Sequence, residues 1–232
     1  MFTIRKANDR GLTNIGWLSS RHSFSFGDYY DPKNHNYRTL RVINDDVIAG
    51  GGGFGTHPHR DMEIITYVLS GELKHQDSMG NGSVIRPGEW QKMSAGSGVA
   101  HSEYNASDDV PAHLLQIWIM PDTKGLKPEY AQQTVSEADK LGKWAVAASK
   151  DGRNGSSVLH QDVTLNVATV RPGDTFGYDL AMGRGAWLHV ATGAITVNGT
   201  RLDAGDAVAI ENESRIDVIG VANGEVLLFD LA

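Results

Sequence analysis

Apolar and polar residues alternate over short stretches along most of the chain, and turns containing glycine separate these stretches. Such alternation is typical of half-buried β-strands, and many short strands with frequent turns indicate a β-sandwich or β-barrel. The segment at 63–69 is rich in Ile, Thr, Tyr and Val, and the segment at 113–120 is almost continuously apolar. We therefore predict an all-β fold, with one short helix at 130–141.

The second half of the chain repeats the turn pattern of the first half. The Leu-Ser-Gly turn at 69–71 recurs as Ala-Thr-Gly at 191–193, and Arg-Pro-Gly-Glu at 86–89 recurs as Asp-Ala-Gly-Asp at 203–206. Self-similarity of this kind indicates two copies of one structural unit. The sequence therefore predicts two β-barrel domains.

A polar stretch at 121–130 marks the expected boundary between these domains. It contains two prolines and a glycine, which is typical of a linker. We place the first domain at residues 1–121 and assign the linker, the short helix and the second barrel to residues 122–232.

Composition narrows the range of partners and compartments. The chain has 232 residues and a formal net charge of -7, which argues against direct nucleic-acid binding because that requires a basic surface. The absence of cysteine excludes disulfides and thiolate metal sites and fits a reducing cytoplasm. No signal peptide and no stretch long enough for a membrane helix is apparent. We expect a cytoplasmic protein without membrane or nucleic-acid partners.

Two pairs of potential metal ligands lie in the first domain. His57 and His59 form one pair, and His101 and Glu103 form the other; each pair follows a glycine-rich turn. On a β-strand, residues two apart point to the same face. If the two strands lie side by side, the four side chains converge on one point. Imidazole nitrogens and a carboxylate oxygen suit a divalent transition metal.

The repeat offers a test of this interpretation, since a single His-x-His pair is often only a surface feature. Two facing pairs are stronger evidence, because a cluster of buried polar rings is costly without a metal. In the second copy the four ligand positions hold other residues, namely Asp179, Ala181, Val218 and Gly220. We therefore expect one metal ion, in the first domain, and a degenerate second barrel without metal.

The segments around the ligand pairs resemble the pirin family of the cupin superfamily. The resemblance rests on LRVINDDVIAGGGGFGTHPHRDMEIITYVLSGELKHQDSMGN at 40–81 and on SAGSGVAHSEYN at 94–105. RKANDRG at 5–11 and SFSFGDYYDP at 23–32 also fit. The resemblance covers the whole chain, most strongly up to residue 121. It implies a bicupin, two antiparallel jelly-roll barrels with metal in the first.

The resemblance also implies a ligand set and an activity. The metal ligands of the family carry over to His57, His59, His101 and Glu103, whereas Glu63, near the position of the glutamate ligand in ordinary cupins, is interpreted as structural. Members of the family are associated with quercetin 2,3-dioxygenase activity, an oxidoreductase reaction that opens a flavonol ring with loss of carbon monoxide. The expected partners are an aromatic small molecule and dioxygen.

Three imidazoles and one carboxylate are typical of non-haem iron sites and leave two octahedral positions open. Fe(II) is therefore the expected metal, with Zn, Cu, Ni, Co and Mn as alternatives. Glu103 is expected to act as a ligand and, as a second possibility, as the catalytic acceptor of a substrate proton.

We expect the substrate pocket to be lined by Phe24, Phe26, Met93 and Gln116, for which core packing is the alternative. The alternative function is a metal-binding regulatory protein that acts through a protein partner.

Overall fold

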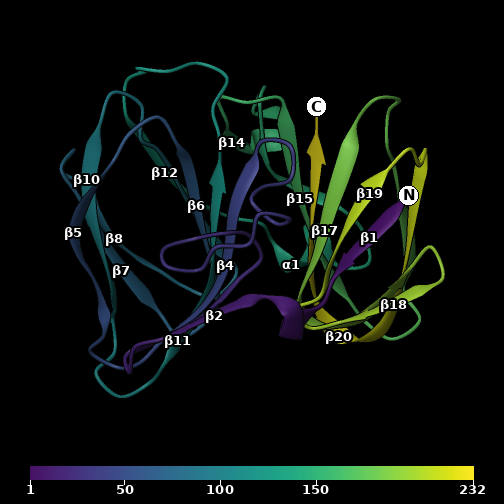
Figure 1. The fold of residues 1–232 in the computed structure, drawn as a ribbon, viewed down its shortest axis with the longest axis horizontal. Helices are drawn as coiled ribbons and strands as arrows, with labels where there is room; N and C mark the ends of the chain where they lie inside the picture. Colours follow the sequence, from purple (N-terminus) through teal and green to yellow (C-terminus); the bar gives the residue numbers. More distant parts are fainter. The chain divides into compact units, whose positions relative to one another are not determined.

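The computed structural model describes residues 1–232, which form two compact units. The N-terminal unit comprises Arg10–Thr134, and the C-terminal unit comprises Met1–Asp9 together with Val135–Ala232. Both units consist almost entirely of strands (Figure 1). The strands pair antiparallel, apart from the short parallel ladder between β13 and β14 and one isolated parallel bridge, Leu141 to Thr169. The predicted all-β fold with two antiparallel domains is confirmed.

Two sheets make up the N-terminal unit. The larger sheet has the order β12-β9-β6-β11-β4-β3-β2, and the smaller has the order β5-β10-β7-β8. The larger contains β2 (Gly11–Asn14), β3 (Leu18–His22), β4 (Leu40–Ile48), β6 (Glu63–Ser70), β9 (Glu89–Ser94), β11 (Ala112–Ile119) and β12 (Glu129–Thr134). The smaller contains β5 (Gly53–His59), β7 (Leu73–Asp77), β8 (Gly82–Ile85) and β10 (Val99–Asn105).

The two sheets of the N-terminal unit share one core. Leu73 and Ile85 of the smaller sheet pack with Ile48, Val68 and Leu114 of the larger one, and all five are fully buried or nearly so. Inward apolar residues that alternate with outward polar ones therefore hold the sheets face to face. This packing positions β5 and β10, which carry the predicted metal ligands.

The C-terminal unit contains a single nine-stranded sheet of order β1-β19-β17-β20-β15-β13-β14, with β16 paired to β20 and β18 paired to β17. Its strands are β1 (Phe2–Arg5), β13 (Ala145–Ser149), β14 (Ser157–Val158), β15 (Val163–Val170), β16 (Thr175–Asp179), β17 (Gly185–Val197), β18 (Thr200–Asp203), β19 (Ala207–Glu211) and β20 (Arg215–Leu231). Register shifts between the long strands β17 and β20 bend the sheet around its core.

The first strand of the chain belongs to the C-terminal unit. β1 pairs with β19, so that Phe2 lies opposite Ile210 (Figure 1, purple beside yellow-green). The ammonium group of Lys6 lies 2.8 Å from a carboxylate oxygen of Asp206, which extends this attachment. The expected first domain at 1–121 therefore differs from the unit found, because its first nine residues belong to the other unit.

The expected boundary and helix also differ from the structure. Residues 129–134 form strand β12, which pairs with β9, so the N-terminal unit ends at Thr134 rather than at residue 121. Inward contacts of Tyr130 and Gln132, two residues apart, favour the strand: the Tyr130 hydroxyl bonds with Ser83, and the Gln132 amide donates to the Val84 carbonyl. The helix is limited to α1 (Glu137–Lys140), capped by Ser136.

Two short 3-10 helices, η1 (Ala7–Asp9) and η2 (Arg153–Gly155), complete the elements. No helix of the protein combines the length and the apolar character that crossing a membrane requires.

The structure confirms the repeat found in the sequence. Gly71 and Gly193, in the matching first turns, have φ values of 72° and 75°. Gly88 and Gly205, in the matching second turns, have φ values of 81° and 80°. These left-handed conformations favour glycine. A Cβ at Gly71 or Gly193 would also lie 2.5 or 2.3 Å from a backbone oxygen of the neighbouring chain segment. The two units therefore reuse one turn geometry.

Candidate metal centre

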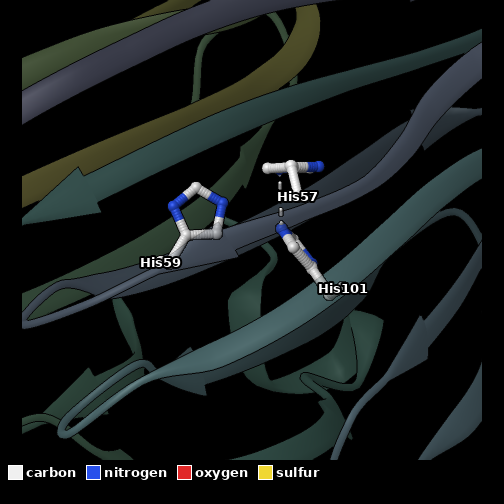
Figure 2. A group of neighbouring side chains, drawn as sticks. All are labelled: His57, His59 and His101. Carbon is white, nitrogen blue, oxygen red and sulfur yellow. Dashed lines mark hydrogen bonds between the residues drawn. The ribbon is translucent and has the colours of Figure 1, made fainter.

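Strands β5 and β10 bring three histidines together. The strands pair antiparallel, with His101 directly opposite His57 and Val99 opposite His59. Figure 2 shows the rings of His57 and His59 on one strand facing the ring of His101 on the next. The predicted side-by-side arrangement of the two ligand pairs is therefore present. Glu103 lies opposite Phe54 rather than Gly55, because a bulge follows His101.

The ring nitrogens of these histidines point at one another. One nitrogen from each of His57, His59 and His101 lies within 4.8 Å of the other two. The shortest separation, 3.1 Å, joins the Nε2 atoms of His57 and His101 (Figure 2). Two imidazole nitrogens that each lie about 2.1 Å from one metal ion are roughly 3.0–3.4 Å apart at octahedral or tetrahedral angles. The spacing of the two rings therefore fits a shared metal ion.

One hydrogen bond of His57 fixes its tautomer. Its Nδ1 lies 2.8 Å from the carbonyl oxygen of Gly55, which can only accept, so Nδ1 carries the hydrogen. Nε2 of His57 then presents a lone pair toward His101. A backbone carbonyl that holds the second nitrogen is the usual outer contact of a metal-binding histidine.

Burial keeps the other two rings neutral. Burial, together with the neighbouring rings of His101 and His57, lowers the pKa of His59 to about 4, although the carboxylate of Glu103 opposes this shift. Burial lowers the pKa of His101 to about 3, again with contributions from adjacent histidines, His57 and His75. Neutral imidazoles are the form that binds a metal. The donor set thus fits a divalent transition metal.

Glu103 follows His101 on β10 and is 3% exposed. Both of its carboxylate oxygens accept hydrogen bonds from buried side chains: the Thr66 hydroxyl donates at 3.1 Å and the Gln116 amide at 2.9 Å. Its oxygen groups with nitrogens of His75 and His101 within 4.8 Å, whereas the three-histidine group does not include it. The structure therefore places Glu103 beside the histidine cluster, in a fixed orientation.

A cavity of about 450 Å³ opens over these residues. His57, His59, His101 and Glu103 all contribute to its lining. The other lining residues are mainly aromatic or polar: Trp17, Phe26, Asn44, Gly53, Phe54, Gly55, Ile64, Gln116, Trp118 and Asp46. The cluster thus forms part of the wall of an aromatic pocket large enough for a small organic ligand.

Two of the four predicted pocket residues, Phe26 and Gln116, line this cavity. Phe24 and Met93 do not. Met93 is completely buried in a core cluster with Ile64, Ala95 and Val99. Phe24 is 2% exposed and lies outside the lining. For these two residues the core-packing alternative holds, because their side chains are enclosed within the unit.

Sequence reasoning missed Asn44 and Asp46, which lie two apart on β4. Polar residues at that spacing in the otherwise apolar segment 40–48 were the available signal. Asp46 is 3% exposed, and its Oδ1 atom has no hydrogen-bond partner in the protein. Burial, together with the negative charges of Asp45 and Glu103, raises the pKa of Asp46 to about 7, although a hydrogen bond with Ser20 and the nearby His113 oppose this shift.

Glu63 has the structural surroundings expected for it. The Ser94 hydroxyl donates to Glu63 at 2.9 Å, and the ammonium of Lys92 lies 3.6 Å from the same carboxylate. Glu63 belongs to neither group of potential metal ligands.

Two family models match the two halves of the chain. The family model for pirin matches residues 4–119, and the model described as the quercetinase C-terminal cupin domain matches residues 146–231. A relative from Escherichia coli strain K12, named quercetin 2,3-dioxygenase, is 48% identical over 231 residues and is aligned over 100% of this chain and 99% of its own length. The chain belongs to the pirin family.

Solved pirin structures agree with this assignment. The crystal structure of YhhW from Escherichia coli has a TM-score of 0.96 at 46% identity, covering 100% of this chain and 98% of that one. The crystal structure of the bacterial pirin YhhW in complex with nickel(II) has a TM-score of 0.95 at 46% identity, covering 100% and 99%. This member of the pirin family therefore has the bicupin fold, and the predicted resemblance is confirmed.

Proposed function

We propose that this pirin is a metal-dependent dioxygenase that cleaves flavonols such as quercetin. One divalent metal would be held in the N-terminal unit by His57, His59, His101 and Glu103. The observation that carries the proposal is the cluster of imidazole nitrogens in the wall of the 450 Å³ aromatic cavity. The names of its relatives, quercetin 2,3-dioxygenase among them, support the substrate class.

The aromatic side chains of the pocket suit a flat substrate. Phe26 and Trp118 pack edge to face with ring centroids 5.3 Å apart, and Trp118 packs against His59 at 5.0 Å. These contacts connect the aromatic wall directly to the histidine cluster. The aromatic side chains would bind the ring system of a flavonol and exclude water from the reacting face.

When bound, a divalent transition metal supplies Lewis acidity toward a substrate hydroxyl and coordination positions open to dioxygen. The protein's own residues orient the site. Thr66 and Gln116 each donate to one oxygen of Glu103, which fixes the orientation of the carboxylate and leaves a lone pair on each oxygen for a metal. We therefore propose the ligand role as the main role of Glu103 and the acceptance of the substrate proton as a secondary one.

Fe(II) is the metal we propose, because three imidazoles and a carboxylate resemble non-haem iron sites. Copper and nickel bind such donors more tightly, so the metal found in purified protein depends on supply. Cytoplasmic location stays our expectation because the chain contains no cysteine.

The test is oxygen uptake with quercetin and with luteolin, which lacks the 3-hydroxyl. Metal-loaded protein should consume oxygen with quercetin only, and His101→Ala should abolish the uptake. If the native protein consumes no oxygen with quercetin, or if His101→Ala is equally active, the dioxygenase proposal fails. The alternative, a metal-binding regulatory protein that acts through a protein partner, then becomes the leading interpretation.

A further inference from the structure

His101 contacts a second polar partner on the side away from His57. Its Nε2 faces His57, whereas its Nδ1 lies 3.5 Å from Nδ1 of His75. Nε2 of His75 in turn lies 3.4 Å from Oδ2 of Asp77. Both contacts are at the long end of the hydrogen-bond range. They form a continuous chain from Asp77 through His75 to His101.

This chain is enclosed within the small sheet of the N-terminal unit. β7 carries His75 and Asp77 and pairs with β10, with His101 opposite Asp77 and Glu103 opposite His75. The side chains of His75 and Asp77 have no exposed surface. The ring of Tyr130 packs on His75 with centroids 5.2 Å apart. Neither His75 nor Asp77 is among the site residues predicted from the sequence.

The donors around Asp77 determine in which direction the hydrogen bonds run from His101 through His75 to Asp77. The side chain of Asn81 donates to Oδ2 at 2.8 Å, and the backbone N–H groups of Met79 and Asn81 donate to Oδ1 at 2.9 and 3.0 Å. All three groups are donors, so both oxygens of Asp77 must act as acceptors. A carboxylate only accepts, so Nε2 of His75 must carry the hydrogen.

The remaining hydrogens follow from this first assignment. With Nε2 of His75 protonated, its Nδ1 bears a lone pair and accepts from Nδ1–H of His101. Nε2 of His101 is then left with a lone pair. It faces the lone pair of His57 Nε2, which the carbonyl of Gly55 fixes, across 3.1 Å. Two facing lone pairs at that distance are satisfied by a cation between them.

We propose that Asp77 and His75 are positioning residues that set the tautomer of His101 and so prepare the metal centre before the metal binds. The opposite tautomer of His101 would donate to His57, and His75 would then turn a lone pair toward Asp77. The carboxylate disfavours that arrangement. This inference rests on the proposed function in one respect, because it takes His101 as a metal ligand.

Direct coordination of the metal is the alternative role for His75. Its nitrogen, one nitrogen of His101 and a Glu103 oxygen lie within 4.8 Å of one another, which is compatible with direct coordination by His75. The two roles predict different hydrogen positions. A positioning residue keeps Nε2–H toward Asp77 and receives a hydrogen bond at Nδ1, whereas a ligand gives its Nδ1 lone pair to the metal.

Long-range ¹H–¹⁵N NMR of the histidine rings tests the proposal directly. In metal-free native protein we expect hydrogen on Nδ1 of His101 and on Nε2 of His75. On addition of zinc, Nε2 of His101 should take the shift of a ligand nitrogen together with one nitrogen each of His57 and His59, and no nitrogen of His75 should do so. Hydrogen on Nε2 of His101 in both states, or a ligand shift at His75, would overturn the proposal.

The substitution Asp77→Asn reverses the hydrogen bonds between Asp77, His75 and His101 while keeping the shape of the side chain. The oxygen of the new amide should stay with the two backbone donors, which places its NH₂ group toward His75 and requires the Asn81 side chain to turn its amide oxygen toward that group. His75 then accepts at Nε2 and donates from Nδ1, which forces hydrogen onto Nε2 of His101. We expect nickel affinity to fall about 10- to 100-fold, the usual effect of losing an outer contact of a metal ligand. Tyr130→Phe, which keeps the ring on His75, should bind nickel like the native protein.

Two substitutions of His75 separate positioning from packing. In His75→Asn the amide oxygen can accept near the former Nδ1 position, whereas in His75→Phe the ring volume remains but the acceptor is lost. Positioning predicts tighter nickel binding by His75→Asn than by His75→Phe. A packing role predicts the reverse order and would overturn the proposal. Circular dichroism verifies folding of each variant, and the NMR of native protein decides the question if a variant does not fold.

Failure of this inference is distinguishable from failure of the proposed function. The same nickel titration includes His59→Ala, which should lose binding if the proposed ligand set is right. If native protein binds nickel, His59→Ala does not, and Asp77→Asn binds as tightly as native protein, only the positioning role fails. If native protein binds no nickel, or if His59→Ala binds normally, the proposed metal centre fails.

Discussion

His57 and His101 face each other from neighbouring strands with their Nε2 atoms 3.1 Å apart. The carbonyl of Gly55 holds the other nitrogen of His57, so the ring of His57 presents a lone pair at this contact. A pair of strands that places two imidazoles in this way forms a site for a cation, and a third imidazole, that of His59, lies within 4.8 Å.

Loss of His59 should remove most of the metal and leave the fold intact. His59 is half-exposed at the cavity, so His59→Ala leaves the buried core unchanged. The metal affinity should fall by more than the roughly 10- to 100-fold typical of outer contacts. Metal analysis after dialysis, with circular dichroism for the fold, measures this. His35→Ala, an exposed histidine in the 31–39 loop, is the control and should retain full metal content.

The hydrogen bonds to Glu103 should contribute measurably to stability. Gln116→Leu removes the amide that donates to Glu103 at 2.9 Å and leaves a buried carboxylate with one fewer partner. Hydrogen bonds to charged groups contribute about 1.5–3 kcal/mol. The free energy of unfolding of metal-free protein, from urea denaturation, should fall by about that amount. An unchanged free energy of unfolding would show that Gln116 does not support the carboxylate. Gln133→Leu, at the outer strand β12, provides a comparison.

Asp46 should make stability depend on pH. Its pKa is raised from 3.8 to about 7 by burial, so between about pH 4 and pH 7 the folded protein holds a proton that the unfolded chain has released. The contribution of Asp46 to the free energy of unfolding therefore falls as pH rises through this window and is lowest above pH 7. Over the whole window the change is on the order of 4 kcal/mol.

Asp46→Asn isolates this effect because the amide resembles the protonated acid. The variant should be less affected by pH, and its advantage over native protein should grow from pH 5 to pH 8. Urea denaturation of metal-free protein at several pH values measures the difference. A constant difference across that range would show that Asp46 is ionised throughout.

Removal of residues 1–6 should destabilise the C-terminal unit and leave the N-terminal unit protected. The deletion takes away β1 and the Lys6 contact to the buried carboxylate of Asp206. Hydrogen exchange should therefore accelerate in β19 and β17 and stay unchanged in β4 and β11. Faster exchange in β4 with unchanged β19 would contradict the assignment of β1 to the C-terminal unit.

The sequence predicted those parts of the site that depend on local periodicity. Two ligands spaced i, i+2 on a strand share a face, and glycine-rich turns marked where those strands begin. The repeat could also be recognised in the sequence, because Gly71 and Gly193 occupy positions where a side chain would collide with a neighbouring backbone.

Features set by tertiary pairing were not predictable in this way. Asp46 and Trp118 line the cavity from strands distant in sequence, and nothing local shows that they meet. Met93 was expected in the pocket but is enclosed in the core with Ile64. The segment of β12 was expected to be helical. The pairing with β9 and the contacts of Tyr130 favour a strand there, and neither can be recognised from the local sequence.

Reconstitution of metal-free protein tests the central claim most directly. Fe(II) is added in steps to the apoprotein under anaerobic conditions, and oxygen uptake with quercetin is measured at each step. The rate should rise in proportion to bound metal and reach its plateau at one ion per chain, and His57→Ala should remain inactive at every step. Oxygen uptake by the metal-free protein, or a plateau at two ions per chain, would contradict a single metal centre in the N-terminal unit.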